Sequence, residues 1–221
     1  NQHKIIHCGE GGIAVTNDDE LAVRLQLIRN HGEAAVEDMG YTNLINMVGG
    51  NYRLPEIEAA IATEQLKKLP ILLKQRIDLA NYLTEKLSRL DFLTPPVVRE
   101  NSDHVYYLYP LKYHEEAAGL TREKYIDNIR ELGIPLCRFA GGYIRPLYLE
   151  PVFAKRDRFK NGFPYSLHPA SERPRYERGV CPVTEHLYDK EMIVTAYNYP
   201  PLTKSDMDDV IKAFTKAATM K

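Results

Sequence analysis

The sequence predicts an α/β chain, with a mostly helical first part and a small α+β domain after it. Three observations carry this prediction. Apolar residues recur at helical spacing from about residue 54 to residue 90, and strand-forming residues gather at 104–109 and 192–194. A glycine turn at residues 9–12 also precedes a short alternating segment near the start. Helices and strands are therefore both expected, in separate stretches of the chain.

Length, charge and cysteine content narrow the class of protein. The 221 residues suffice for one large domain or two small ones. A net charge of -1, with basic residues spread along the chain, gives no reason to expect a nucleic-acid partner, and no apolar run is long enough to cross a membrane. The odd number of cysteines, Cys8, Cys137 and Cys181, argues against a disulfide framework, and the seven histidines lack metal-ligand spacing. We expect a cytoplasmic protein without a metal.

The first part opens with the glycine turn. Residues 11–12 are glycines, which permit backbone angles closed to other residues, and residues 13–15 alternate as in a short strand. Residues 17–19 then offer N-caps for a helix that runs to about His31. Gly32 supplies the stop of that helix.

A long loop and two helices complete the first part. Residues 33–53 lack periodicity, and loops of that length are usually functional or disordered. Helical spacing follows from about Leu54 to Leu90, where Pro70 fits best as the start of a second helix. Prolines and polar residues then break the pattern. We therefore expect a domain boundary near residue 92, with domains 1–92 and 93–221.

Residues 93–221 are predicted to form a small α+β unit. In chain order we expect a strand at 104–109, a helix from Thr121 to Gly133, a short helix at 182–188, a strand at 192–194 and a terminal amphipathic helix. Ser205 with Asp208 resembles a capping box that opens the terminal helix, although Asp replaces the usual Glu or Gln. Glu185 is interpreted as a local cap or pairing residue.

Six stretches in chain order carry a resemblance to a known family. They are Lys4–Thr16 with its Glu-Gly-Gly turn, Arg29–Gly32, Gly50–Leu54, Ala59–Leu66, Gly142–Phe153 and Cys181–Glu185. Together they resemble the DegT/StrS family of sugar aminotransferases, which use pyridoxal phosphate on the fold-type I scaffold. A single stretch is weak, but six in the right order over nearly all of the chain are specific. The resemblance implies the end of a large α/β/α domain, long linking helices and a small α+β domain.

The resemblance makes Lys4 the catalytic lysine that forms the Schiff base with pyridoxal phosphate. The family's lysine lies six residues before the glutamate of the Glu-Gly-Gly turn, here Glu10. A lysine amine must be neutral to attack an aldehyde, and burial or a nearby cation favours that form. Without the resemblance, Lys4 is best interpreted as a solvated surface residue. His3 is adjacent, and some relatives of this fold carry histidine at the lysine position and act as sugar dehydratases.

The resemblance also implies four further site residues, each with a structural alternative. Asn51 would reach from one subunit to the cofactor phosphate of the other, or else hold its own turn. Arg53 would bind a donor carboxylate or an acceptor phosphate, or else form an ion pair with Glu56. His31 would line the site, or else interact with the end of a helix. Tyr143 would bind sugar, or else cover a small core.

The implied function is transamination of a keto sugar, expected to be nucleotide-linked, with glutamate or glutamine as the amino donor. The role implied for Asn51 predicts a homodimer with shared active sites. The family's acid that pairs with the pyridine nitrogen, and its stacking aromatic residue, belong to an upstream half. We therefore expect this chain to be a C-terminal portion that is inactive alone. A dehydratase of the same fold, or a non-catalytic regulator or sensor, stays an alternative.

Overall fold

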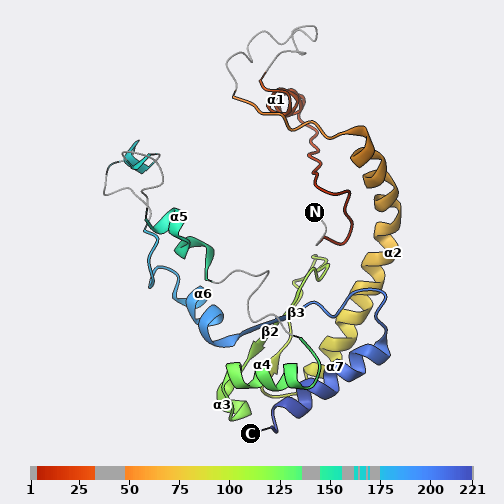
Figure 1. The fold of residues 1–221 in the computed structure, drawn as a ribbon, viewed down its shortest axis with the longest axis vertical. Helices are drawn as coiled ribbons and strands as arrows, with labels where there is room; N and C mark the ends of the chain where they lie inside the picture. Colours follow the sequence, from red (N-terminus) through yellow and green to blue (C-terminus); the bar gives the residue numbers. More distant parts are fainter. Residues whose placement is uncertain are drawn as a thin grey trace. The chain divides into compact units, whose positions relative to one another are not determined.

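The computed structural model describes residues 4–32, 48–135, 145–155, 162–163, 165–167, 169 and 175–220. Contacts divide the chain into two compact units, residues 1–71 and 72–221, and the boundary lies inside the long helix α2 (Figure 1). The family's domain boundary near residue 92 stays a prediction. No described helix combines the length and the apolar character needed to span a membrane.

Helix α1 (Asp19–Arg29) is the first element of unit 1. Asp18 is its N-cap, and the Oδ1 atom of Asp18 accepts a hydrogen bond of 2.9 Å from the backbone N of Leu21. This confirms the predicted helix start, because a side-chain oxygen satisfies one of the free N–H groups of the first turn. Val23 and Leu27 are the buried residues of α1.

The prediction that Gly32 ends α1 needs a correction of one residue. The backbone N of Gly32 bonds to the carbonyl of Leu27 at 2.8 Å, the closure typical of a left-handed helix cap. The residue inside this closure is His31, with a φ of 64°, and Gly32 follows with a φ of 75°. Histidine therefore occupies the left-handed position that glycine usually fills, and Gly32 acts one position later.

The short strand expected at 13–15 is absent from the described residues. Ile13 and Val15 are 78% and 88% exposed, and residues 11–16 form no ladder with another described segment. A strand is stable only when it pairs with a neighbour, so alternation alone cannot produce one here. The glycine with left-handed geometry in this turn is Gly9, with a φ of 94°, rather than Gly11 or Gly12.

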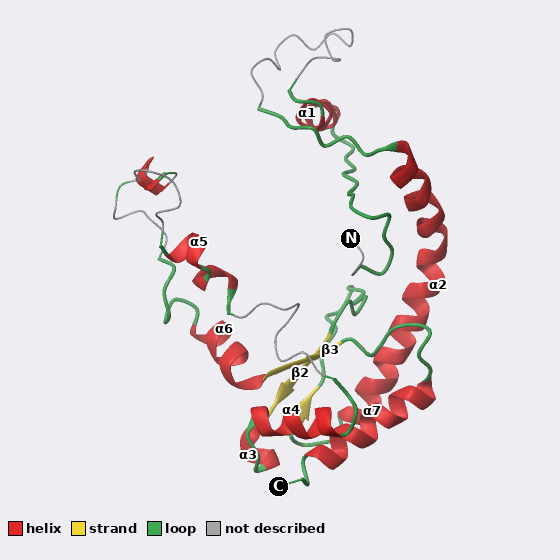
Figure 2. Ribbon diagram, in the orientation of Figure 1, coloured by secondary structure: helices red, strands yellow, loops and turns green. Residues whose placement is uncertain are grey.

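Helix α2 (Glu56–Leu87) is continuous over 32 residues, with Pro70 inside it (Figure 2). The prediction that Pro70 begins a second helix is therefore wrong. Proline removes one backbone hydrogen bond and disturbs the preceding turn, but packing of an amphipathic face can hold a helix together across such a defect. The buried face of α2 after Pro70 consists of Leu79, Ala80, Leu83 and Leu87.

Unit 2 contains an antiparallel sheet in the order β1-β2-β3. The strands are β1 (Leu93–Thr94), β2 (Tyr109–Tyr113) and β3 (Met192–Thr195), with Leu93 opposite Tyr113 and Tyr109 opposite Thr195. The predicted strand at 192–194 is confirmed. The strand predicted at 104–109 instead starts at Tyr109, because Tyr106 has a φ of 48°, which no strand residue adopts.

Helices α4 (Arg122–Glu131) and α7 (Lys204–Ala217) pack together beside this sheet. Thr121 caps α4 as predicted, and Gly133 follows the helix with a φ of 85°. The predicted capping box at Ser205 is wrong, because Thr203 and Asp206 form the box two residues earlier. The core combines α2, the sheet, α4 and α7, and includes Leu83, Leu87, Phe92, Leu111, Tyr113, Tyr125, Ile129, Ile193, Val210 and Phe214.

Shorter elements complete unit 2. They are α3 (Glu115–Ala118), a 3-10 turn (Leu147–Leu149), α5 (Pro151–Ala154), a 3-10 turn (Tyr165–Leu167), α6 (Pro182–His186) and a π-helical turn (Leu187–Glu191). Helix α6 confirms the short helix predicted after residue 181.

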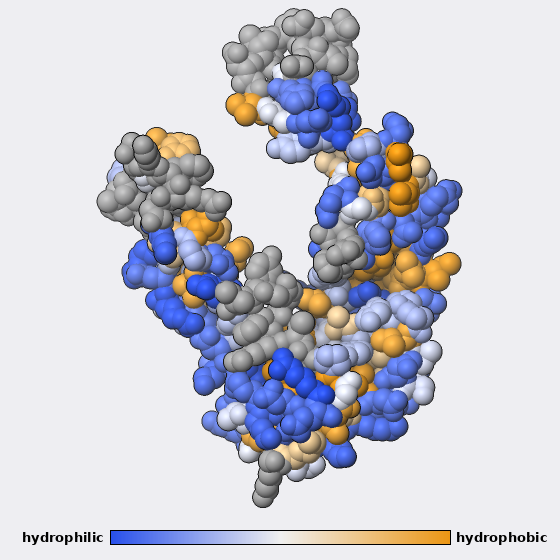
Figure 3. All heavy atoms as spheres, in the orientation of Figure 1, coloured by the Kyte–Doolittle hydropathy of each residue, from blue (hydrophilic) through white to orange (hydrophobic). Residues whose placement is uncertain are grey.

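Along α2, Figure 3 shows hydrophobic side chains at the surface, and Ile57, Leu66 and Ile71 are 75%, 56% and 65% exposed.

A buried arginine joins α4 to the segment that precedes β3. Arg122 is 1% exposed, and its guanidinium donates to the carbonyls of Tyr188 at 2.8 Å, Asp189 at 2.6 Å and Met192 at 3.4 Å. Its Nη2 atom also pairs with Oε1 of the half-exposed Glu123 at 3.2 Å, so carbonyl oxygens and one carboxylate together accommodate the charge.

Candidate functional site

The segment around Asn51 is attached to the end of α1 by main-chain hydrogen bonds. The backbone N of His31 donates to the carbonyl of Gly50 at 3.0 Å, and the backbone N of Gly50 donates to the carbonyl of Ile28 at 2.9 Å. A third bond of 2.9 Å runs from the backbone N of Tyr52 to the carbonyl of Arg29. Asn51 lies inside this attachment, so its backbone position is set by α1.

Gly49 makes this attachment sterically possible. A Cβ atom at position 49 would lie 2.4 Å from the backbone N of Gly32, 2.7 Å from the carbonyl carbon of His31 and 2.9 Å from the carbonyl oxygen of Ile28. All three neighbours are backbone atoms, which cannot swing aside as a side chain can. Residue 49 must therefore lack a side chain for the two segments to approach each other.

The side chains of Asn51 and Arg53 provide hydrogen-bond donors next to this attachment. The Oδ1 atom of Asn51 accepts from the backbone N of Arg53 at 3.4 Å, whereas its Nδ2 atom makes no hydrogen bond within the described residues. The Nη1 atom of Arg53 donates to Oδ1 of Asn30 at 2.5 Å. The alternative ion pair with Glu56 does not form among the described residues, so the remaining guanidinium donors of Arg53 are available to an anion.

Lys4 belongs to the same unit and lies on the other side of the glycine turn. Lys4 is exposed within the described residues. The turn itself contacts the Asn51 segment, since a Cβ atom on Gly11 would lie 3.1 Å from Sγ of Cys8 and 3.1 Å from Cδ1 of Leu54. A Cβ atom there would be tight, but both neighbours are side-chain atoms that can shift by a few tenths of an ångström, and the Lys4 turn lies against Leu54, the residue that follows Arg53.

His31 and Tyr143 are the other two predicted site residues. His31 is exposed at the end of α1, and its left-handed backbone directs the chain toward Gly50. Such a conformation is several-fold enriched in histidine, asparagine and aspartate, and it occurs often at functional positions. Tyr143 lies outside the described residues.

A polar network in unit 2 links two of the motifs from the sequence. Tyr148 donates to Oε1 of Glu185, which also accepts from the backbone N of Gly179 at 2.7 Å. Arg178 lies 3.8 Å from Oε2 of Glu185 and donates to Oδ2 of Asp189 at 2.7 Å. The prediction that Glu185 pairs locally is confirmed. The sequence motifs contained Tyr148 and Glu185 but gave no signal that they contact each other.

The network shifts the pKa values of its members. Burial, together with the hydrogen bond to Glu185, raises the pKa of Tyr148 to about 12. The same hydrogen bond from Tyr148 holds the pKa of Glu185 below its usual value, and the hydrogen bond from Arg178 lowers the pKa of Asp189. The neutral phenol and the two carboxylates are thus the favoured forms, as expected for a group of residues that positions a loop.

Comparison with known proteins decides the family. The model of the DegT/DnrJ/EryC1/StrS aminotransferase family matches residues 1–215. The chain belongs to this family. Among curated members, GDP-perosamine synthase of Caulobacter vibrioides is 33% identical over 153 residues, which is 69% of this chain and 39% of that protein. The spore coat polysaccharide biosynthesis protein SpsC of Bacillus subtilis is 24% identical over 220 residues, covering 95% of this chain and 50% of SpsC.

Solved structures of family members have the same fold. S. venezuelae DesV matches with a TM-score of 0.68 and 24% identity, over 94% of this chain and 46% of DesV. DesI, solved in the presence of its TDP-sugar product, matches with a TM-score of 0.67 and 18% identity, over 98% of this chain and 47% of DesI. These matches confirm the predicted fold class, part of the fold-type I aminotransferase scaffold. The chain spans about half the length of the relatives it matches, or less.

The residues of this DegT/DnrJ/EryC1/StrS family member fit a phosphate-bearing cofactor. Asn51 offers a neutral amide donor and Arg53 a planar cation, the two kinds of group that bind phosphate oxygens. Lys4 offers a primary amine on the adjacent turn. Within the described residues, no group of three or more His, Cys, Asp or Glu could hold a metal ion.

Proposed function

We propose that the protein is a pyridoxal-phosphate-dependent aminotransferase that acts on a keto sugar. The family match over residues 1–215 carries the proposal, and the 33% identity to GDP-perosamine synthase supports a sugar as the acceptor. A nucleotide-linked sugar, glutamate or glutamine as the amino donor, a homodimer with shared sites and a cytoplasmic location complete the proposal.

Lys4 has the central chemical role in this proposal. Its amine would attach the cofactor and then, when released, transfer a proton between the substrate carbon and the cofactor. Bound pyridoxal phosphate would supply the electron sink for that carbon. Because Lys4 is exposed within the described residues, the surfaces that exclude water from its amine must come from elsewhere in the assembly.

Asn51 and Arg53 would bind anions. The free Nδ2 group of Asn51 would donate to a phosphate oxygen of the cofactor held by the other subunit. Arg53, fixed at one end by Asn30, would direct its remaining donors toward a donor carboxylate or an acceptor phosphate. His31 and Tyr143 would contact the substrate.

A visible absorption spectrum of the full-length protein, with and without glutamate, tests the role of Lys4. We expect the cofactor band to be lost in Lys4→Ala and kept in Lys74→Ala, a matched control whose lysine pairs with Asp78 on the surface of α2. A Lys4→Ala protein that keeps both the band and turnover would show that another residue holds the cofactor. A glutamate-insensitive band in the unmodified protein would favour the sensor alternative.

Mixed subunits test whether Asn51 acts across a dimer. Lys4→Ala and Asn51→Ala are each expected to lose activity as pure proteins. If each site combines Lys4 of one subunit with Asn51 of the other, random mixing gives hybrid dimers with one intact site. Activity should then recover to about one quarter of that of the unmodified protein. No recovery after verified subunit exchange would place both residues in one subunit and contradict the shared site.

A further inference from the structure

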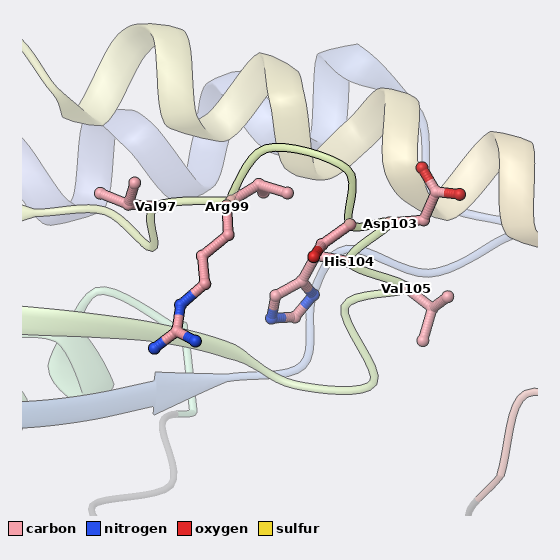
Figure 4. Close-up of a pocket in the computed structure, with 7 residues that line it drawn as sticks. Val97, Arg99, Asp103, His104 and Val105 are labelled. Carbon is pink, nitrogen blue, oxygen red and sulfur yellow. The ribbon is translucent and has the colours of Figure 1, made fainter.

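A pocket in unit 2 is lined by residues that belong to none of the sites described above. It has a volume of about 430 Å³ and is formed by the loop between β1 and β2. Its lining combines three apolar residues with hydrogen-bonding groups: Val97, Val98, Val105, Arg99, Ser102, Asp103 and His104. Figure 4 shows the side chains of Arg99 and His104 directed to the same side of the loop, whereas the carboxylate of Asp103 is directed away from them.

His104 is held in one orientation and one neutral tautomer. Its Nδ1 atom accepts a hydrogen bond of 2.8 Å from the backbone N of Tyr106, so the proton of the neutral ring resides on Nε2. The imidazole also stacks on the Tyr106 ring, with 4.1 Å between centroids and 29° between planes. His104 therefore presents a fixed N–H donor at its other ring edge.

Tyr106 is itself fixed by buried donors. Its backbone has a φ of 48°, which is sparsely populated for tyrosine, and its side chain is 3% exposed. The carbonyl of Tyr106 accepts from Nη1 of Arg76 at 3.0 Å and from Nδ2 of the fully buried Asn198 at 3.0 Å. Strained backbone held by its surroundings often occurs where a site is preorganised, and here it positions His104.

Arg99 lacks a partner within the described residues. It makes no hydrogen bond or ion pair there, although long cationic side chains readily find carboxylates on a protein surface. A planar guanidinium and a fixed imidazole N–H suit an anion, and the lining also contains Val97, Val98 and Val105, which are 84%, 41% and 40% exposed, so part of a bound ligand can be apolar. Arg99 supplies one positive charge, which matches the single charge of a carboxylate.

We propose that this pocket binds a small organic carboxylate with a short branched apolar chain. The carboxylate receives hydrogen bonds from Arg99 and from Nε2 of His104, and the chain extends toward Val105. This site is independent of the proposed cofactor residues, so it stands or fails separately from the aminotransferase proposal.

Isovalerate is a suitable probe of this pocket. Titration of the purified protein, followed by the ring signals of His104 in carbon-labelled histidine at fixed pH, should give a saturable shift. The dissociation constant should be on the order of 1 mM, as expected for a ligand of this size. Arg99→Ala should raise that constant about 10-fold or more, and Arg175→Ala, which removes an exposed arginine elsewhere, should leave it unchanged.

Altered ligands and a variant of the apolar lining test the contacts of the carboxylate separately from those of the apolar chain. Isovaleramide, the neutral isostere, should not bind, and acetate should bind several-fold more weakly than isovalerate. Val105→Thr should weaken isovalerate but not acetate. The proposal is overturned if isovalerate gives no saturable shift, if isovaleramide binds as tightly, or if Arg99→Ala leaves binding intact. Because Arg99 has no partner among the described residues, its replacement should not disturb folding, which an unchanged melting temperature would verify.

Discussion

Replacing Gly49 with alanine should detach the Asn51 segment from α1. The added Cβ atom would lie 2.4 Å from the backbone N of Gly32, a separation that real Cβ atoms do not show, so one of the two backbones must move. Gly49 does not have a left-handed φ, and the effect of the substitution is therefore one of space rather than of backbone conformation.

The structure sets the expected size of the effect. Three backbone hydrogen bonds join residues 28–31 to residues 50–52, at 3.0, 2.9 and 2.9 Å. A typical intramolecular hydrogen bond contributes about 1 kcal/mol, so separation of the segments should cost about 3 kcal/mol. That free energy is local to unit 1, because no core residue of unit 2 takes part.

Gly50→Ala is the matched control. A Cβ atom at position 50 would lie 2.9 Å from the ring of Tyr52, which is 70% exposed and can rotate away. We expect Gly49→Ala to lower protection of the amides of His31 and Tyr52 in hydrogen exchange by about 100-fold, and Gly50→Ala to change it little. Equal effects of the two substitutions, or none from Gly49→Ala, would refute the close approach described above.

Three further changes test the caps and the polar network. His31→Gly should stabilise the end of α1 by about 1 kcal/mol, because glycine adopts a left-handed φ without strain, while reducing turnover if the imidazole contacts substrate; urea denaturation and kinetics measure the two effects. The raised pKa of Tyr148 favours the folded state at neutral pH, and this contribution should disappear as pH rises from about 10 through about 12. Denaturation at several alkaline pH values should show a shallower decline in Tyr148→Phe, where Glu185 no longer has a phenol to interact with. Thr203→Ala should cost about 1 kcal/mol of unfolding free energy, and Ser205→Ala almost none, which thermal melts compare directly.

Helices were predictable because their signals are local. The N-caps Asp18 and Thr121, the apolar stripe of α2 after Pro70 and that of α7 depend on neighbours within a few residues, and the structure places them as expected. The terminal capping box was misplaced because Thr203 and Ser205 both have aspartate three residues later. Sequence spacing could not distinguish them, and only the geometry of the first turn does.

Features fixed by distant contacts were not predictable. The start of β2 depends on the left-handed Tyr106, which Arg76 and Asn198 hold from 30 and 92 residues away. Residues 104–109 have strong strand preferences, and those preferences were overridden by tertiary structure. The continuity of α2 through Pro70 has the same origin, since packing outweighs a local preference.

In the candidate site, too, local motifs were predictable and distant contacts were not. The motif Gly50–Leu54 indicated Asn51 and Arg53, but nothing in it indicated that Arg53 bonds to Asn30 or that the segment is attached to α1. Those contacts join residues about 20 apart, and the attachment to α1 uses backbone atoms, which carry no residue identity. The exposed position of Lys4 agrees with the interpretation of a solvated surface lysine that the residue type alone favours.

The buried Arg122 has a consequence for how unit 2 assembles. An arginine cannot lose its charge, so its guanidinium can leave water only when the carbonyls of residues 188–192 are already in place. Those residues lie 66 to 70 positions later in the chain and lead directly into β3. Before they dock, Arg122 keeps only the neighbouring Glu123 as a partner, so burial of this guanidinium couples the docking of α4 to that of the segment before β3.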